Sequence, residues 1–298
     1  AKLTKPLKIN SLVVQQFISS LPFTLTNSQK KAINSILLDL ESSTPMNRLL
    51  AGEVGSGKTI IAVVMALATH SAGLRTVVMA PTLILASQLH MAFASLLTPL
   101  GLTTSLVTGS NKGSLDTDIV IGTQALLTKK VSNVGLTIID EQHRFGVKQR
   151  DSLGLFSSHS LMMTATPIPR SLAQTLFSQL DITYLTELPS GRLPVKTFAV
   201  PETKRFDAYS WLKTEIEKGN QVFFVTPLIE QAEEQDQTPL KSLKDLEAKL
   251  KKTFPEQTID IMHGKMKDQE KLAHMESFRS GLTQILVATS MIEVGLDV

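Results

Sequence analysis

Residues 49–59 read LLAGEVGSGKT and match the pattern G-x-x-x-x-G-K-[ST] at Gly52, Gly57, Lys58 and Thr59. An apolar run precedes the glycines and a helical pattern of apolar residues follows them, which predicts a strand, a tight loop and a helix. The glycines let the backbone turn sharply and point several N–H groups inward. Together with the start of the helix, these groups form a cradle for phosphate oxygens. The stretch therefore predicts a nucleotide site at the carboxyl end of a strand in an α/β sheet.

Each residue of this loop has an expected role in holding a triphosphate. Lys58 is expected to reach the β- and γ-phosphates, and Thr59 to offer its hydroxyl to Mg²⁺. The backbone of the other loop residues would surround the phosphates: Gly52, Glu53, Val54, Gly55, Ser56 and Gly57. The alternative is a flexible glycine turn without a ligand. The four fixed positions arise by chance only about once per hundred chains of this length, and the strand–loop–helix context favours the nucleotide site further.

Short β-branched runs alternate with amphipathic stretches along the chain. In the first part, strands are predicted at residues 47–51, 76–80, 118–122, 136–140 and 161–164, and helices at 58–70 and 83–97. After a break, strands are predicted at 221–226, 258–262 and 284–288, and helices at 240–252 and 267–279. This alternation predicts an α/β fold with mostly parallel sheets and helices on both faces.

The break falls at residues 187–197, which read ELPSGRLPVKT. Pro189, Gly191 and Pro194 give this segment the chemistry of a turn or a linker. We therefore predict two domains of related layout, at residues 1–190 and 191–298. The second would be incomplete at its C-terminus, because the chain stops straight after a strand and a loop.

Composition narrows the classes of protein. The 298 residues are 42% hydrophobic and 19% charged, as in a globular protein, and there is no cysteine. Disulfides, cysteine-ligated zinc and thiol catalysis are therefore excluded. The apolar run at residues 60–68 is too short to span a membrane, and no signal-like leader opens the chain, so we expect a cytoplasmic protein without a membrane partner. A net charge of +3 does not discriminate between a nucleic-acid partner and an ordinary surface.

Residues 136–143 read LTIIDEQH, an apolar strand that ends in two adjacent acids. Because ligands gather at the carboxyl ends of parallel strands, Asp140 is placed to hold Mg²⁺ and Glu141 to orient and deprotonate an attacking water. The alternative is a strand that simply ends in solvated acids. A phosphate loop about 80 residues upstream favours the catalytic interpretation.

Residues 140–147, DEQHRFGV, resemble motif II of the RecG helicases, a branch of superfamily 2. Other segments resemble further helicase motifs in the same order and at similar spacing: residues 21–29 (Q-motif region), 80–86 (motif Ia), 121–126 (motif Ic), 164–170 (motif III), 226–230 and 263–266 (motif IV region) and 288–298 (motif V). The resemblance covers nearly the whole chain. It implies two RecA-like P-loop NTPase domains, ATP and Mg²⁺ as cofactors, a monomer, and branched DNA such as forks and Holliday junctions as the partner.

The resemblance also implies individual roles. For the nucleotide these are adenine recognition by Gln29 in the Q-motif region with Phe23, γ-phosphate sensing by Gln142, and contacts from the second domain by Gly295 and Asp297. Residues implied to couple hydrolysis to DNA contacts are His143, Thr164 and Thr166. Residues implied to lie along the DNA groove are Thr82, Gly109, Thr123, His263 and Thr289. A threonine at a helix start is, however, more often a helix cap than a DNA contact.

Two related motors differ in these motifs. Mfd usually has a second acid in place of Gln142 and a motif V that reads E-T-G where this chain has Glu293-Val294-Gly295, and PriA carries a DEEH-type tetrad. The RecG resemblance is therefore favoured over an Mfd-type translocase or another superfamily 2 motor. RecG proteins also have an N-terminal wedge domain and a motif VI, and we expect both to be missing from this chain. We therefore expect weak or no ATPase activity and no branch specificity from this chain alone, or a nucleotide-binding module without turnover.

Overall fold

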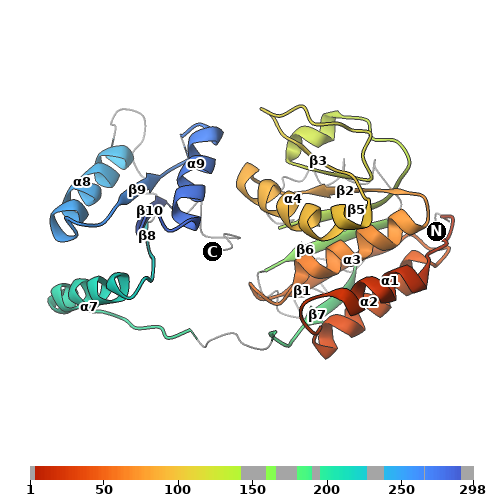
Figure 1. Cartoon of the computed structure of the whole chain (residues 1–298), viewed down its shortest axis with the longest axis horizontal. Coiled ribbons are helices and arrows are strands. Elements are labelled where there is room, and N and C mark those ends of the chain that lie inside the picture. Colours follow the sequence, from red (N-terminus) through yellow and green to blue (C-terminus); the bar gives the residue numbers. More distant parts are fainter. Residues whose placement is uncertain are drawn as a thin grey trace. The chain divides into compact units, whose positions relative to one another are not determined.

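A computed structural model of the chain describes residues 4–141, 159–165, 180–189, 195–226, 238–264 and 266–289 (Figure 1). The chain divides into two compact units, Ala1–Leu193 and Pro194–Val298. Each unit contains a parallel sheet with helices packed against it. The predicted α/β fold class is therefore confirmed.

The sheet of the first unit has seven parallel strands in the order β3-β4-β2-β5-β6-β1-β7. The strands are β1 (Asn47–Gly52), β2 (Arg75–Met79), β3 (Thr104–Val107), β4 (Ile119–Gly122), β5 (Val134–Asp140), β6 (His159–Thr164) and β7 (Asp181–Leu185). Because all the strands are parallel, their carboxyl ends form one edge of the sheet. We call this the carboxyl edge, and the opposite one the amino edge.

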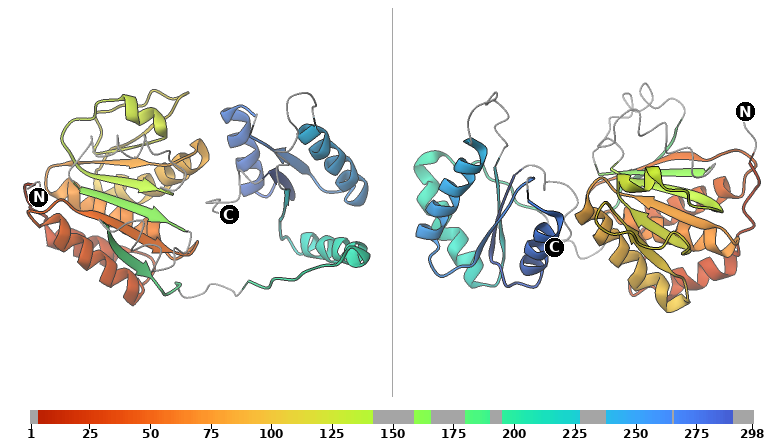
Figure 2. Two further views of the ribbon diagram at one scale, coloured as in Figure 1. Left: turned by 180° about the vertical axis from the view of Figure 1, so that it is seen from behind. Right: turned by 90° about the horizontal axis from the view of Figure 1, so that it is seen from above.

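Four helices pack on one face of this sheet (Figure 2). They are α1 (Ser11–Ser20), α2 (Asn27–Leu40), α3 (Lys58–Ser71) and α4 (Leu83–Leu97); α4 is followed by the 3₁₀ turn η1 (Thr98–Leu100). Successive strand residues point to opposite faces, so Leu50 joins the helix-covered core and Leu49 joins a smaller cluster on the other face. The 3₁₀ turn η2 (Gln124–Thr128) contributes Leu126 to that smaller cluster.

The helical stretch from Leu83 to Leu100 is long and apolar enough to span a membrane, judged by length and hydropathy alone. In the fold, however, Leu85, Leu89 and Phe93 of α4 are buried in the core beneath the sheet. A core helix of this kind passes the same test of length and hydropathy. The absence of a membrane partner stays a prediction.

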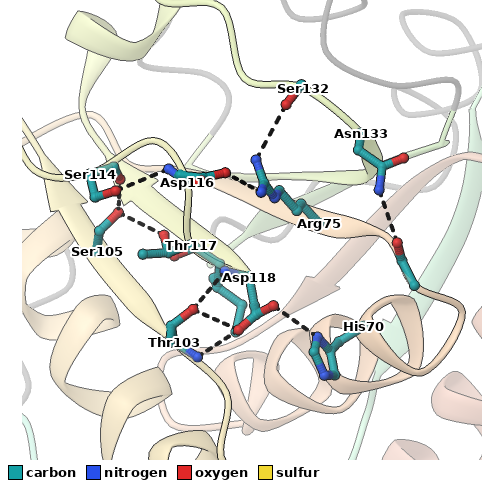
Figure 3. A network of polar contacts seen from close by, with 12 residues as sticks. His70, Arg75, Thr103, Ser105, Ser114, Asp116, Thr117, Asp118, Ser132 and Asn133 are labelled. Carbon is teal, nitrogen blue, oxygen red and sulfur yellow. Dashed lines mark hydrogen bonds and ion pairs between the residues drawn. The ribbon is translucent and has the colours of Figure 1, made fainter.

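A network of hydrogen bonds and side-chain ion pairs holds the amino edge together (Figure 3). Asp118 accepts hydrogen bonds from the backbone N (2.8 Å) and the hydroxyl (2.6 Å) of Thr103, and lies 3.2 Å from Nδ1 of His70 at the end of α3. Arg75, the first residue of β2, pairs with Asp116. These contacts join the starts of β2, β3 and β4 to the C-terminal end of α3.

The second unit has a three-stranded parallel sheet in the order β8-β10-β9. Its elements are the 3₁₀ turn η4 (Glu202–Lys204), α7 (Arg205–Glu217), β8 (Val222–Thr226), α8 (Thr238–Thr253), β9 (Ile259–Met262), α9 (Asp268–Arg279) and β10 (Ile285–Thr289). Its core includes Leu250, Phe254 and Val287. Tyr209 of α7 packs edge-on against Phe254, with ring centroids 5.9 Å apart.

Candidate nucleotide site and nucleic-acid interface

The phosphate loop joins β1 to α3 at the carboxyl edge of the first sheet. Gly52 ends β1, Lys58 begins α3, and Gly57 is the N-cap of α3 with a left-handed φ of 85°. A Cβ atom on Gly57 would lie 2.2 Å from Nε2 of Gln29, so both the backbone conformation and the space require glycine. The cap residue has no side chain to cap the helix, which leaves this end of α3 suited to an anion.

The side chain of Lys58 is held against the start of the phosphate loop. Its Nζ donates hydrogen bonds to the backbone oxygens of Gly52 (2.7 Å) and Glu53 (3.0 Å). Burial lowers the pKa of Lys58, while the nearby carboxyl groups of Asp140 and Glu141 act in the opposite direction. The loop therefore places one desolvated ammonium group beside Asp140, the last residue of β5, and Glu141, which follows it.

Gln29 is packed against the phosphate loop and is 2% exposed. Its Nε2 donates to the backbone oxygen of Ser56 at 2.8 Å, and its Oε1 accepts from the backbone N of Thr26 at 2.8 Å. Thr26 in turn caps α2 by accepting from the backbone N of Gln29 at 3.2 Å. The result is a capping box that fixes the amide of Gln29 in one orientation. The hydroxyl of Ser56 is buried and has no hydrogen-bond partner within the described parts of the chain.

The two predicted catalytic acids end β5 and differ in their surroundings. Burial and the neighbouring Glu141 raise the pKa of Asp140 to about 7, although Lys58 acts to lower it. Glu141 is 4% exposed and takes a left-handed φ of 51°. Its Oε1 accepts from the backbone N of Ala165 at 3.0 Å, and its Oε2 lies 3.5 Å from the hydroxyl of Thr164. The end of β6 thus orients the carboxylate of Glu141.

Along the carboxyl edge, the predicted nucleotide and DNA residues fall into two groups. Those assigned to the phosphates, the metal or coupling follow β5, β6 and β1, which are neighbours in the sheet. Gly109, Thr123 and Thr82 follow β3, β4 and β2, the three strands on the far side of β5. Adjacent strands lie about 4.8 Å apart. The second group therefore lies at increasing distances from Asp140 and Glu141 along the carboxyl edge.

Among the described DNA-groove candidates of the first unit, Thr82 also has an ordinary structural role. Thr82 is the N-cap of α4, and its hydroxyl accepts from the backbone N of Leu85 at 3.3 Å. Thr123 is the N-cap of η2 but makes no side-chain cap bond, and a Cβ atom on Gly109 would meet nothing within 4 Å. The helix-cap alternative therefore holds for Thr82, while Gly109 faces open space.

In the second unit, His263 directly follows β9, and Thr289 is the last residue of the neighbouring strand β10. Both lie at the carboxyl edge of that sheet, where Thr289 is paired in register with Thr226 of β8. Thr289 is 2% exposed, and its hydroxyl has no hydrogen-bond partner within the residues that the structure describes.

Other predicted site residues are partly exposed or fall outside the described residues. Phe23 lies in the turn before α2 with half of its side chain exposed, and Thr59 is partly exposed in the first turn of α3. Five predicted residues fall outside the described residues: Gln142, His143, Thr166, Gly295 and Asp297. Among the described residues, no cluster of three or more His, Asp or Glu side chains could hold a metal ion unaided.

Several contributors to the site were not predicted. Thr26 carries a local signal, because T-x-x-Q before an apolar helical pattern is a capping-box sequence. Leu185 packs where a Cβ atom on Gly52 would lie, 2.9 Å from its own Cβ atom, and Glu187 accepts a hydrogen bond from the backbone N of Asn27. Leu185 and Glu187 carry no such local signal, because their partners are more than 100 residues away in the sequence.

Comparison with known proteins agrees with this arrangement. The family model of the DEAD/DEAH box helicases matches residues 26–175, and that of the helicase conserved C-terminal domain matches residues 207–298. The chain is 43% identical to the ATP-dependent DNA helicase RecG of Aquifex aeolicus and 42% identical to that of Thermotoga maritima. These alignments cover 97% and 98% of the chain, but only 38% and 39% of the two relatives.

A solved structure of RecG bound to a three-way DNA junction superimposes on the whole chain with a TM-score of 0.80 and 37% sequence identity. The match covers 40% of that protein. The predicted resemblance to the RecG helicases is confirmed, and the chain spans about two fifths of the length of these relatives. Since the first family model alone matches half of the residues, the chain belongs to the DEAD/DEAH box helicases.

Proposed function

We propose that this chain binds ATP with Mg²⁺ and couples ATP hydrolysis to the remodelling of branched DNA, as the motor segment of a RecG-type helicase. One observation carries the proposal. The phosphate loop, a desolvated lysine and two adjacent acids meet at the carboxyl edge of one parallel sheet. Ligands of α/β folds bind at this edge.

The residues present fit a magnesium–triphosphate complex. The uncapped start of α3 and the ammonium group of Lys58 suit the phosphates, and the orphaned hydroxyl of Ser56 adds a buried polar group within the loop. Thr59 and Asp140 would hold Mg²⁺, which commonly takes one or two protein oxygens and completes its shell with phosphate oxygens and water. When bound, the metal ion neutralises charge that develops on the transferred phosphoryl group.

The amide of Gln29 fits adenine better than guanine. Its hydrogen bonds to Ser56 and Thr26 leave one N–H and one oxygen lone pair. Adenine presents an N7 acceptor and an N6 donor side by side, which match these two remaining positions. Guanine presents acceptors at both positions, so one of them would face the amide oxygen of Gln29.

In hydrolysis, the two acids would divide the work. Asp140 must lose its proton to serve as a metal ligand, and its pKa of about 7 makes that loss easy once a cation is near. Glu141 would orient the attacking water and accept its proton, and its own position is fixed by the backbone of Ala165. Thr164 lies beside the same carboxylate, which fits a role in coupling.

DNA would follow the outer half of the carboxyl edge in the first unit and the corresponding edge of the second unit. The small polar residues there suit contacts with phosphate oxygens, which fix a duplex in place without reading its sequence. A relative solved on a three-way DNA junction supports DNA as the partner. Preference for forks and four-way junctions, a monomeric state and a cytoplasmic location belong to the same proposal.

Binding measurements test this function separately from turnover. The whole chain should bind a fluorescent ATP analogue in the presence of Mg²⁺, and it should bind duplex DNA, forked or linear, more tightly than RNA of equal length. Lowering the salt concentration should strengthen DNA binding, since contacts to phosphates release counterions. A chain that binds no nucleotide, or that prefers RNA to forked DNA, would contradict the proposal.

A further inference from the structure

Glu187 links the segment that follows β7 to the first turn of α2. Its Oε2 accepts a hydrogen bond from the backbone N of Asn27, the first residue of α2, at 2.9 Å. Glu187 lies two residues beyond the end of β7, an edge strand paired with β1. In that pairing Leu185 is the partner of Gly52, so Glu187 lies near the start of the phosphate loop.

The first turn of α2 must be placed accurately because the buried side chain of Gln29 is packed tightly against the phosphate loop. A Cβ atom on Gly57 would lie 2.2 Å from Nε2 of Gln29, so the amide fills the space that only a glycine leaves open. A shift of a few tenths of an ångström would stretch the 2.8 Å hydrogen bond from Gln29 to Ser56 or force the amide into the loop.

The capping box leaves one backbone N–H group, that of Asn27, for Glu187 to accept from. Thr26 and Gln29 satisfy each other's backbone N–H groups, but the N–H of Asn27 at the helix start needs a partner from elsewhere. A carboxylate is well suited to this position because it accepts the hydrogen bond and also interacts favourably with the helix dipole.

The other end of α2 is tied to the same strands. Nε of Arg48 in β1 lies 2.7 Å from the carboxylate of Asp39 in α2, and Nη1 of Arg48 donates to the hydroxyl of Thr183 in β7 at 2.7 Å. The helix is therefore attached to β1 and β7 near both of its ends. Glu187 is the attachment at the end that carries Gln29.

We propose that Glu187 is a positioning residue for nucleotide recognition. By holding the first turn of α2 it keeps Gln29 in register with the phosphate loop, and it thereby sets the preference for adenine over guanine. This inference rests on the proposed function, in which the Gln29 amide reads the base. Residues 186–189 follow β7 in the chain, so Glu187 ties this segment to the helix that carries the base-reading amide.

The test compares the affinities of the whole chain for fluorescent ATP and GTP analogues in Mg²⁺. The unaltered chain should prefer ATP by at least about tenfold, and Glu187→Ala should lower this preference by about 3- to 10-fold, the loss expected for a helix cap. Glu187→Gln retains a carbonyl oxygen that can accept from Asn27, and should keep the preference within about twofold of the unaltered chain.

Two further variants separate the possible failures. Glu41→Gln makes the same charge change at the exposed C-cap of α2 and should leave the preference unchanged. Gln29→Ala should abolish the preference if this amide reads the base. If Glu187→Ala matches the unaltered chain while Gln29→Ala loses the preference, the positioning role is wrong and the proposed function stands. If Glu187→Ala only lowers the melting temperature, the role of Glu187 is structural, and if the unaltered chain binds neither analogue, the proposed function fails with the inference.

Discussion

Asp118 and Asp140 lie at opposite edges of the same parallel sheet, and their carboxyl groups have opposite surroundings. Burial acts to raise the pKa of Asp118, but hydrogen bonds from Thr103 and the nearby His70 outweigh burial and hold the pKa below its usual value. At the carboxyl edge, burial and the neighbouring Glu141 raise the pKa of Asp140 to about 7. One carboxylate is stabilised by its partners, and the other is held in a site that disfavours its charge.

Under the proposed function, the two edges of this sheet divide stability and chemistry between them. The amino edge satisfies its polar groups with one another and so holds the strand starts together (Figure 3). The carboxyl edge collects a desolvated lysine, a desolvated acid and an uncapped helix, which together suit a polyanion and a cation. Substitutions of the same type should therefore have different consequences at the two edges.

The largest expected contrast is between two cations. Lys58→Ala should weaken binding of a fluorescent ATP analogue by at least about 100-fold, because the loop loses the ammonium group that is expected to reach the phosphates. Arg75→Ala at the amino edge should leave that affinity within about twofold and lower the free energy of unfolding by about 1 kcal/mol, since its partner Asp116 is exposed. Titration and urea unfolding measure the two effects. Unchanged ATP binding by Lys58→Ala would remove the basis for the site assignment.

Next in size is the effect of Asp140→Asn on stability. The folded chain keeps a proton on Asp140 up to about pH 7, whereas the unfolded chain loses it near 3.8, so the folded state loses stability as the pH rises through this window. Asparagine has no charge to desolvate. The variant should raise the free energy of unfolding by on the order of 3 kcal/mol at pH 8, and the gain should shrink as the pH falls to 5. Urea unfolding at several pH values checks this, and a destabilised variant at pH 8 would contradict it.

A pair of glycines at the two ends of α3 gives a smaller contrast. Gly57 and Gly73 both have positive φ angles, 85° and 75°. A Cβ atom on Gly57 would meet Gln29, whereas one on Gly73 would meet nothing within 4 Å. Gly73→Ala should therefore cost about 1 kcal/mol of stability from the backbone alone, and Gly57→Ala about 1–2 kcal/mol more together with loss of nucleotide binding. Equal costs in thermal unfolding would mean that the Gln29 contact is not tight.

The smallest predicted change is that of Asp118→Asn, the amino-edge counterpart of Asp140→Asn. Because the pKa of Asp118 is lowered in the fold, its charge stabilises the folded chain above the unfolded value of 3.8, and this stabilisation is lost as the pH falls below it. The variant should lower the free energy of unfolding at pH 8 by about 1 kcal/mol through weaker hydrogen bonds to Thr103. A gain in stability at pH 8 would erase the contrast between the edges.

Much of the fold followed from local patterns. The prediction for residues 83–97 coincides with α4, and that for 58–70 is one residue shorter than α3. Strong apolar runs also predicted the strands that end in Gly52, Asp140 and Thr164, because buried parallel strands are apolar on both faces. These elements position the loop between β1 and α3 and the two acids, so the placement of the candidate site was predictable together with them.

Other elements were missed for physical reasons. β7 is a short edge strand with partly exposed residues, and nothing in DITYL shows that it pairs with a strand more than 130 residues earlier. Helix α2 was noticed only for its resemblance to a motif, although Ile33 and Ile36 are spaced as on a buried helical face. The contact between Asn27 and Glu187 spans 160 residues, and the raised pKa of Asp140 depends on burial, so neither has a local signature.

Helix α3 also has a consequence for how the first unit can move. Ten consecutive residues of α3, Ile60 to Thr69, are buried. The whole helix of 14 residues, about 21 Å long, therefore cannot slide or tilt without disrupting the core packing around it. Its amides should be among the last in the first unit to exchange with deuterium. Since Lys58 is the first residue of this helix, we expect its position to stay fixed within the first unit when other parts of that unit move.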